Sequence, residues 1–361
     1  MARPVTATAP TAPRRRITSL DVAREAGVSR TLVSYVLNNV AGIKVREGTR
    51  RAIIEAADRL HYRPNQSARA IRTGRFRCLA LLLGPRYYLP PELIGGLYRA
   101  TTRRDLHLAL AALPEAKLIN EEQAPKILRE LLADGLLINT IEDAPPLLYD
   151  RLNQFRIPGV AINSRRAHDC VYSDDRAAAR HAVAALAEMG HRRILYANFS
   201  EHRHGPPHYS VADREGGYRE GMATAGLTPH SCGADLVEDA AARVALAAKL
   251  LGAPPRPTAV VAYSYPTAAA LHAAALTLGL RVPGDLSLLT LDNRPFDYLG
   301  LPMSTLEIPW DAVAENAVEM LLAKIENPRM SLPSRAVAYS PEIRGGTCAP
   351  PPPPQTAHAE A

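Results

Sequence analysis

The sequence contains little cysteine and no stretch that could cross a membrane. Its 361 residues hold no run of about 18 consecutive apolar residues, the least that a membrane-spanning helix needs. The four cysteines, Cys78, Cys170, Cys232 and Cys348, lie far apart and form no CxxC pair, so reduced thiols are expected. The first 16 residues lack the apolar core of a secretory signal, which favours a cytoplasmic protein.

Signatures of catalysis are also missing. GxSxG, GxGxxG, Walker A and HExxH motifs do not occur in the context that each requires. His202, His204 and His208 have a spacing that can bind a metal, but no full ligand set accompanies them. A lid loop or solvated histidines are the alternative. We therefore expect no enzyme, no cofactor and no metal.

Positive charge is concentrated in the first fifth of the chain. The formal net charge is +7, and residues 1–75 hold 15 Lys/Arg against 5 Asp/Glu, a net of +10. The remainder is therefore slightly acidic. A basic module on a near-neutral body indicates a polyanionic partner, since released counterions favour such binding. Charge alone leaves DNA, RNA and an anionic membrane surface open.

Residues 17–62 predict three short helices. Thr18 can cap the first helix, with Asp21 near its positive end. Gly27 ends that helix, and Ser29 is a good N-cap for a second helix over 30–37. A third helix is expected at about 47–60. Three short helices with a glycine-containing turn between the first two predict a helix-turn-helix.

The second of these helices has two faces. Val33, Val36 and Leu37 project inward at helical spacing. Thr31 and Tyr35 project outward, as does Asn38, and Arg30 stands in the first turn. A recognition helix presents such residues to base edges in the major groove. An ordinary solvated face is the alternative.

The rest of the chain alternates between apolar runs and amphipathic segments. Buried strands are expected at 78–84, 106–113, 135–138, 158–163, 193–197, 259–263 and 286–291. Helices are expected at 92–103, 121–133, 176–189, 213–225, 240–251 and 267–278. Two such series predict two doubly wound parallel sheets, with a ligand in the cleft beyond the strand ends. A further helix at 311–325 serves either internal packing or a dimer interface.

Long motifs carry a family resemblance. The runs "SLDVAREAGVSRTLVSYVLNN" (19–39) and "TRRAIIEAADRLHYRPNQSARAIRTGR" (49–75) resemble the DNA-binding module of the LacI/GalR (lactose-repressor) family. "MGHRRILYA", "REGGY", "LGLRVPGDLSLLTLDN" and "PMSTLEIP" are similar to its effector domain. The resemblance implies a small all-α helix-turn-helix domain followed by an α/β periplasmic-binding-protein-like domain made of two doubly wound subdomains.

The resemblance also implies a hinge after the "YRPN" run. In that family the hinge is helical on operator DNA and pushes an apolar wedge into the minor groove, at a cost that contacts on bent DNA offset. By position, Ile71 is the wedge and Ala68 packs nearby, while Arg69, Arg72 and Arg75 contact phosphates. The candidate DNA-binding residues are Thr18, Ser29, Arg30, Thr31, Leu32, Ser34, Tyr35, Asn38, Asn65, Ala68, Arg69, Ile71 and Arg72.

Two of these residues depart from the family pattern. Tyr35 stands where many members carry an Arg that contacts guanine, and Leu32 stands where Thr is usual. Because Tyr cannot make the bidentate contact with guanine, the operator sequence stays open.

The effector residues implied by the resemblance begin with Arg214 and Asp292, a donor facing an acceptor that suits a polyol. A structural Arg214–Asp292 pair is the alternative. Asn163 stands where Asp is common, and Ser264 stands where the family motif supplies Asn; both departures weaken the sugar inference. Tyr87 or Tyr88 offers a stacking surface, or packs within its loop.

The expected domain boundaries follow. A disordered basic arm (1–16) precedes the helix-turn-helix (17–63) and the hinge (64–75). The effector and dimerisation domain (76–346) has an N-subdomain at about 76–174 and 302–334 and a C-subdomain at about 175–301 and 335–346. A disordered Pro-rich tail (347–361) closes the chain.

These features predict a ligand-responsive, sequence-specific DNA-binding regulator, with repression expected. As a homodimer it binds a near-palindromic double-stranded operator; a tetramer is the alternative state. The expected effector is a small metabolite, a sugar before a nucleobase or another compound. Cytoplasmic, nucleoid-associated localisation and no membrane partner are expected. A solute-binding protein is a remoter alternative, because it should carry a signal peptide and no basic module.

Overall fold

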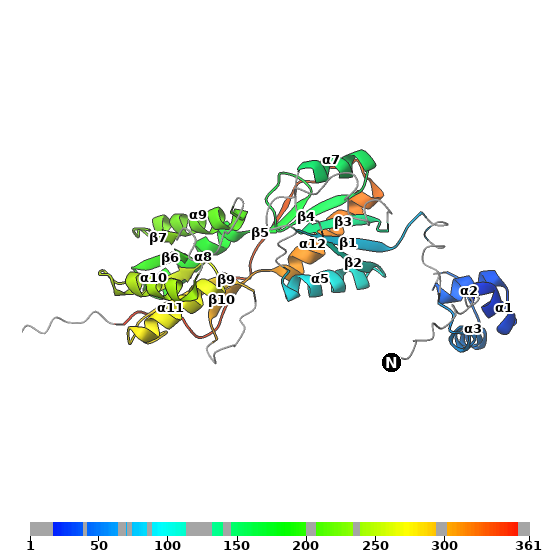
Figure 1. Cartoon of the computed structure of the whole chain (residues 1–361), viewed down its shortest axis with the longest axis horizontal. Coiled ribbons are helices and arrows are strands. Elements are labelled where there is room, and N and C mark those ends of the chain that lie inside the picture. The colour runs from blue at the N-terminus through cyan, green and yellow to red at the C-terminus, as the bar shows by residue number, and fades with distance from the viewer. Residues whose placement is uncertain are drawn as a thin grey trace, which may run out of the picture. The chain divides into compact units, whose positions relative to one another are not determined.

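The computed structural model describes residues 17–38, 42–63, 70, 74–84, 89–112, 132–139, 146–199, 207–233, 239–293 and 302–352. The chain divides into two units, Met1–Phe76 and Arg77–Ala361, which are shown in Figure 1 and considered separately below. Among the described residues, no helix is both long and apolar enough to cross a membrane. The cysteines are unpaired.

The first unit contains a three-helix domain. Its helices are α1 (Ser19–Glu25), α2 (Arg30–Leu37) and α3 (Glu47–Arg59), as predicted to within a residue or two. The helices surround a small core made of Val22, Ala23, Val33, Val36, Ile53, Ala56 and Ala57. Gly27 has a φ of +64° between α1 and α2, a conformation that glycine adopts without strain. The chain can therefore turn sharply between the two helices of the motif.

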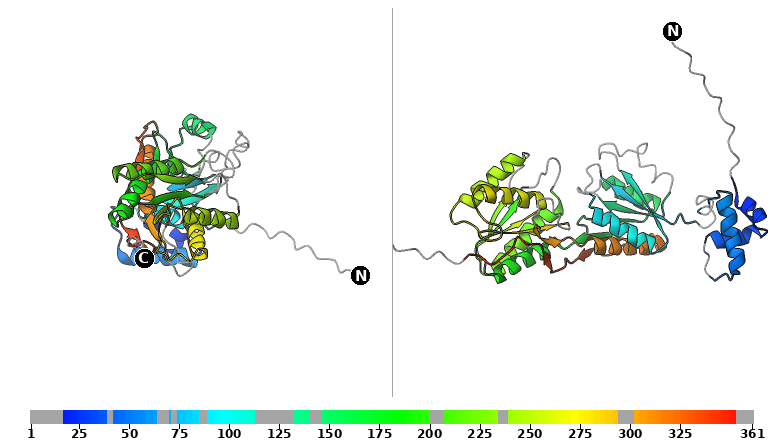
Figure 2. Two further views of the ribbon diagram at one scale, coloured as in Figure 1. Left: turned by 90° about the vertical axis from the view of Figure 1, so that its left-hand side faces the viewer. Right: turned by 90° about the horizontal axis from the view of Figure 1, so that it is seen from below.

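The second unit begins with a six-stranded parallel sheet of order β11-β5-β4-β3-β1-β2. Its strands are β1 (Cys78–Leu83), β2 (His107–Ala112), β3 (Gly135–Asn139), β4 (Gly159–Ile162), β5 (Cys170–Ser173) and β11 (Arg335–Val337). Helices α5 (Pro91–Thr102) and α12 (Trp310–Glu326) lie side by side on one face (Figure 2), and α7 (Pro146–Phe155) packs on the other. This sheet and its helices form the first subdomain.

The second subdomain is built in the same way on a sheet of order β12-β10-β9-β8-β6-β7. Its strands are β6 (Ile194–Asn198), β7 (His230–Gly233), β8 (Ala259–Ala262), β9 (Ser287–Asp292), β10 (Ser304–Glu307) and β12 (Ile343–Arg344). Helices α8 (Asp175–Glu188) and α9 (Tyr209–Thr224) cover one face, and α10 (Ala240–Gly252) and α11 (Tyr265–Thr277) cover the other. Only β12 runs antiparallel to its neighbour. The predicted pair of doubly wound sheets is confirmed.

Two predicted boundaries inside this unit are wrong. Strand β10 pairs with β9 of the second sheet, so the chain passes to the first subdomain after Glu307 and not near Leu301. Strand β11 pairs with β5 of the first sheet, so the chain returns after Val337 and not near Ser334. Both strands are too short for their apolar pattern to indicate a sheet, and strand pairing decides their place. The first crossing follows Ser173.

The predicted start of a disordered tail at residue 347 is also wrong. Thr347 is fully buried, and its Oγ1 donates to the Leu288 carbonyl at 2.6 Å. Ala349 donates its amide to Ser287 Oγ and accepts from His191 Nε2, at 3.0 and 2.9 Å. Residues 345–352 therefore form a strap that belongs to the second subdomain. The low-complexity composition concealed this, because hydrogen bonds that involve the strap backbone and the Thr347 hydroxyl, rather than apolar side chains, hold the strap.

Helix α12 serves internal packing. Val313, Ala317, Met320, Leu321 and Lys324, which share one face of the helix, are all buried against the first subdomain. The dimer-interface alternative is therefore not needed to explain this apolar face. The helix predicted at 121–133 lies almost wholly outside the described residues.

Candidate nucleic-acid interface and effector site

Helix α2 has one buried and one exposed face. Val33 and Val36 lie in the domain core, while Arg30, Thr31 and Tyr35 are exposed, with Tyr35 at 38%. Ser29 Oγ accepts a hydrogen bond from the Leu32 amide at 3.2 Å and so caps the helix. The helix presents a polar surface that begins at its N-terminal turn.

The start of α2 is joined to the start of α1. Arg30 Nε donates to Ser19 Oγ at 3.1 Å. At the start of α1, the amide and hydroxyl of the N-cap residue Thr18 donate to the Asp21 carboxylate at 2.9 and 2.8 Å. These bonds satisfy groups at the helix N-terminus and fix the two N-termini next to each other.

The remaining candidates on α2 are partly engaged within the domain. Asn38 Nδ2 donates to the Ser34 carbonyl at 2.6 Å and to Ser34 Oγ at 3.2 Å. Leu32 is half-buried and packs against the core. Thr31 and Tyr35 are exposed on the outer face of the helix.

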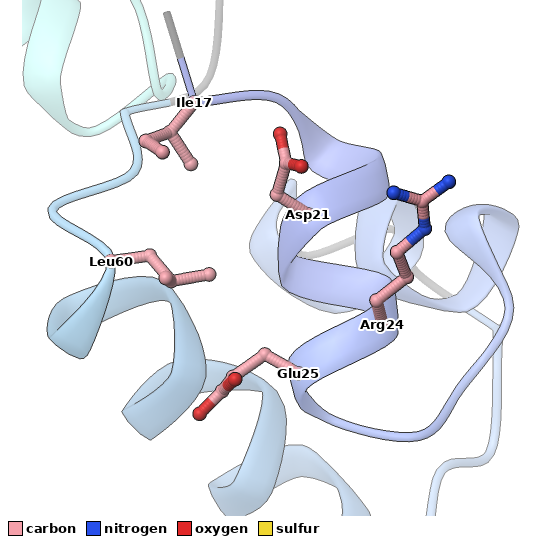
Figure 3. Close-up of a pocket in the computed structure, with 5 residues that line it drawn as sticks. All are labelled: Ile17, Asp21, Arg24, Glu25 and Leu60. Atoms are coloured by element: carbon pink, nitrogen blue, oxygen red, sulfur yellow. The ribbon is translucent and has the colours of Figure 1, made fainter. Parts of the chain in front are cut away.

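A hollow of about 360 Å³ lies on this domain between α1 and the end of α3 (Figure 3). Ile17 and Leu60 contribute its apolar wall, and Asp21, Arg24 and Glu25 contribute charged groups. Glu25 lies 3.4 Å from Arg59 across the hollow's edge, and Asp21 is bonded to Thr18. Asp21 thus serves helix capping, and Glu25 serves the packing of α1 on α3. The candidate hinge residues Asn65, Ala68, Arg69, Ile71 and Arg72 lie outside the described residues.

In the second unit, polar side chains gather at the carboxyl ends of the parallel strands. Asn163 follows β4, Ser264 follows β8 and Asp292 ends β9. Asn163 is 7% exposed and has a φ of +58°, a left-handed conformation that asparagine tolerates better than most residues. Such strand ends are where doubly wound folds bind ligands. Tyr87 and Tyr88 lie outside the described part of the chain.

Arg214 is the most heavily bonded of the predicted effector residues. Its Nε donates to Asp175 Oδ1 at 2.6 Å, and its Nη1 donates to the carbonyls of Tyr263 and Leu291 at 2.5 and 2.6 Å. Its Nη2 lies 3.3 Å from the Tyr339 hydroxyl. The alternative of a structural Arg214–Asp292 pair is therefore wrong, because the carboxylate that Arg214 pairs with is Asp175. The reason is the direction of the guanidinium, which turns toward the buried start of α8.

The electrostatics of this pair follow from its burial. Burial alone would raise the pKa of Asp175, but the Arg214 charge and hydrogen bonds from Arg214, Tyr339 and Ser173 lower it below its ordinary value. Burial would lower the pKa of Arg214, but Asp175 holds it well above its ordinary value. Both groups are therefore charged inside the subdomain, where neither could stand alone.

Asp292 and Ser264 are bound within the second subdomain. Asp292 Oδ2 accepts from the amide of Tyr265 at 2.5 Å, which stabilises the start of α11, and its Oδ1 accepts from the Asn293 amide at 2.7 Å. Ser264 Oγ lies 3.3 Å from Thr267 Oγ1. The structure thus brings Arg214, Ser264 and Asp292 to the carboxyl edge of the second sheet. Asn163 lies at the carboxyl edge of the first sheet.

Several residues at these strand ends were missed from the sequence. Asn139 and Asn198 are buried at the ends of β3 and β6. Asp213, which is 6% exposed, lies in α9. His208, which the sequence offered only as a metal or lid-loop candidate, is the N-cap of that helix. A signal existed for the asparagines, since "GLLIN", "ILYAN" and "VAIN" each end an apolar run with Asn. No such signal existed for Asp213, because its ion-pair partner, Arg165, lies 48 residues away in the sequence.

Known sequences support these two parts of the chain separately. Residues 18–65 match the family described as bacterial regulatory proteins, lacI family, and residues 183–347 match the periplasmic binding protein-like domain. An HTH-type transcriptional repressor PurR of Vibrio cholerae is 30% identical over 320 residues, covering 85% of this chain and 91% of that protein. The chain belongs to the lacI family. This lacI-family protein is therefore a DNA-binding transcription regulator.

Other relatives of this lacI-family protein include the HTH-type transcriptional regulator GalR of Escherichia coli. It is 28% identical over 337 residues, which cover 90% of this chain and 93% of GalR. The fold resembles a solved lac repressor dimer bound to operator and the anti-inducer ONPF, with a TM-score of 0.70, 18% identity and coverage of 93% and 100%. It also resembles the CelR–cellobiose complex, with a TM-score of 0.59, 23% identity and coverage of 92% and 100%.

Proposed function

We propose that this regulator represses transcription as a homodimer that binds a near-palindromic double-stranded operator and responds to a small-molecule effector. The observation that carries the proposal is the outer face of α2, where Arg30, Thr31 and Tyr35 are exposed on a helix whose opposite face is buried. Residues at the N-terminal end of such a helix reach base edges in the major groove, and paired modules read paired half-sites.

Self-association follows from the way such modules read DNA. Two modules read two related half-sites only when two chains assemble with matching symmetry, so we propose a second copy of the chain as the partner. A tetramer is the alternative assembly.

The hinge residues keep the roles that the sequence indicates. We propose that Ile71 inserts into the central step of the operator, that Ala68 packs beside it, and that Arg69, Arg72 and Arg75 contact phosphates, with Asn65 among the DNA-binding residues. Unstacking a base step costs a few kcal/mol, which contacts on bent DNA offset. Specific binding would then depend on two hinges meeting in the dimer.

The effector is proposed to bind at the carboxyl ends of the strands, near Asn163, Ser264 and Asp292, with Tyr87 or Tyr88 stacking on it. Arg214 already donates to four groups of its own chain, so we assign it chiefly to shaping this site. A sugar is the first candidate, since a structurally similar regulator, CelR, binds cellobiose. A nucleobase or another metabolite is the alternative.

A regulator of this kind needs no catalytic group, and we propose that the chain is not an enzyme. It would act in the cytoplasm on nucleoid DNA and need no membrane partner. The named relatives are transcription regulators, which is consistent with that role.

The test joins two measurements on the full chain. Selection from a random duplex library should enrich a near-palindromic site, and no preference over random DNA would refute sequence-specific regulation. A thermal-shift screen of sugars and nucleobases should then identify a compound that raises the melting temperature, since a ligand that binds the folded state stabilises it. That compound should change operator affinity.

A further inference from the structure

Two polar contacts fasten the loop after β4 to the beginning of α9. His208 Nε2 lies 2.8 Å from the carbonyl oxygen of Asn163, and Arg165 Nη1 donates to both carboxylate oxygens of Asp213. Asn163 and Arg165 belong to the first subdomain, whereas His208 and Asp213 belong to the second (β4 and α9 in Figure 1). Both contacts therefore cross from one subdomain to the other.

The His208 ring is held in one tautomer by its neighbours. Its Nδ1 accepts from the backbone amide of Ser210 at 3.4 Å, so the ring proton is on Nε2 and is donated to Asn163. Ser210 Oγ lies 2.8 Å from Nδ1 and 2.8 Å from the Tyr263 hydroxyl. A continuous line of hydrogen bonds thus runs from the end of β8, through the N-cap of α9, to the end of β4.

The ion pair is asymmetric in burial. The Asp213 side chain is 8% exposed, whereas the Arg165 side chain is 50% exposed. Arg165 also stands 5.9 Å from the Tyr172 ring, which packs edge-on against Tyr209 of α9 at 5.7 Å. Arg176 is a second positive charge near Asp213, but it is bonded to Glu220 within the second subdomain. Arg165 is thus the cross-subdomain partner of a carboxylate that opening would expose to water.

We propose that Arg165, Asp213 and His208 are positioning residues that hold the loop after β4 against α9 and set how readily the two subdomains open. None of them needs to touch the effector for this role. Because a domain that opens more readily redistributes its conformational states, removing the contacts changes the effector affinity and the operator affinity of the unliganded protein. Only these last consequences rest on the proposed function.

Opening can be measured directly on the full chain. Spin labels introduced as a noncanonical amino acid at Asp150 of α7 and Thr224 of α9, which are both exposed, report the distance between subdomains without using the native cysteines. In Arg165→Ala, the ratio of open to closed molecules should rise about tenfold, because a charge-assisted contact to a buried group is lost.

The asymmetry in burial gives a sharper expectation. Arg165→Ala leaves a buried, uncompensated carboxylate that only opening can hydrate, so it should open the domain more than the double variant Arg165→Ala/Asp213→Ala. Arg165→Lys should be intermediate, because it keeps the charge and loses the planar fork. His208→Ala should open the domain, and His208→Gln, which keeps a donor, should restore closure in part.

Arg103→Ala is the matched control, since Arg103 pairs with Glu315 entirely within the first subdomain. It should leave the distance distribution unchanged. If Arg165→Ala and His208→Ala also leave it unchanged, or if the double variant opens more than Arg165→Ala alone, the positioning role is refuted. The positioning role and the proposed function can fail independently. If Arg165→Ala changes the spin-label distance but the wild-type chain prefers no duplex over random DNA, the positioning role is supported and the proposed function is rejected.

Discussion

Replacing Arg214 by Ala removes the cation that neutralises Asp175, a carboxylate that is 1% exposed. Breaking a buried pair in this way costs about 3–5 kcal/mol, because an uncompensated charge stays behind. The Tyr263 and Leu291 carbonyls also lose their bonds to Nη1. For a unit of this size, such a loss lowers the melting temperature by about 10 °C.

The double variant Arg214→Met/Asp175→Asn separates charge from packing. It removes both ions and keeps similar volumes, so the remaining cost should be about 1–3 kcal/mol, that of unsatisfied carbonyls. Urea unfolding of the full chain, followed by tryptophan fluorescence of Trp310, measures both variants. A loss below about 1 kcal/mol in Arg214→Ala would refute the reasoning, since buried pairs lose more when broken.

The same pair has a pH signature. The folded-state pKa of Asp175 is lowered from an ordinary value of 3.8, so its stabilisation is present above that value and is lost as the pH falls through the folded-state pKa. In Arg214→Ala, only the hydrogen bonds from Tyr339 and Ser173 still oppose burial, so the pKa of Asp175 should rise. The unfolding free energy of Arg214→Ala should therefore approach that of the wild-type protein as the pH falls from about 7 to about 4, by the linkage between protonation and folding.

Four further outcomes are expected. Ending the chain before Thr347 should lower the melting temperature by several degrees, because buried bonds to β9 are lost, whereas ending it after residue 352 should not. Tyr35→Ala should weaken binding to the selected operator by about 0.5–1.5 kcal/mol, the worth of one neutral hydrogen bond, in a fluorescence-anisotropy titration. Ile71→Gly should weaken specific binding far more than binding to random DNA, since a wedge acts on deformable steps. Burial lowers the pKa of His191 from 6.5, so its contribution to stability is full above 6.5 and declines as the pH falls below it; wild-type protein should lose more urea resistance on acidification than His191→Gln.

Each of these has a matched comparison. Leu276→Ala, on the exposed end of α11, should leave monomer packing intact and serves as a surface control for the truncation. Tyr35→Phe separates loss of the hydroxyl from loss of the ring. Equal losses on specific and random DNA in Ile71→Gly would remove the wedge role. If the urea resistance of His191→Gln and of the wild-type protein falls equally as the pH is lowered, the His191 ring is not the group whose protonation destabilises the protein.

The helices and the central strands were predictable because their signals are local. Helix α2 is fixed by the cap Ser29 and by the inward pair Val33 and Val36, which all lie within eight residues. Strands β1, β3 and β8 are apolar runs buried on both faces, as parallel sheets require.

What could not be predicted depends on pairing between distant segments. Strand β10 has four residues and takes its place only by pairing with β9. Arg214 was predicted to bind the effector, which stays a prediction, and its carboxylate partner is Asp175, 39 residues away, and not Asp292. The Arg165–Asp213 contact likewise joins segments whose proximity no local pattern records. Fold class was therefore accessible from sequence, whereas the bonding of individual polar groups was not.

The order in which strands join the two sheets has a consequence for synthesis of the chain. The first sheet is completed by β11 at residues 335–337, and the second by β12 and the strap at residues 343–352. Nearly the whole polypeptide must therefore be synthesised before either sheet has all of its strands. Pairings between segments that are far apart in the sequence also form slowly. The three helices of residues 19–59 need only each other. On a growing chain, the part that reads DNA can thus fold well before the part that controls it.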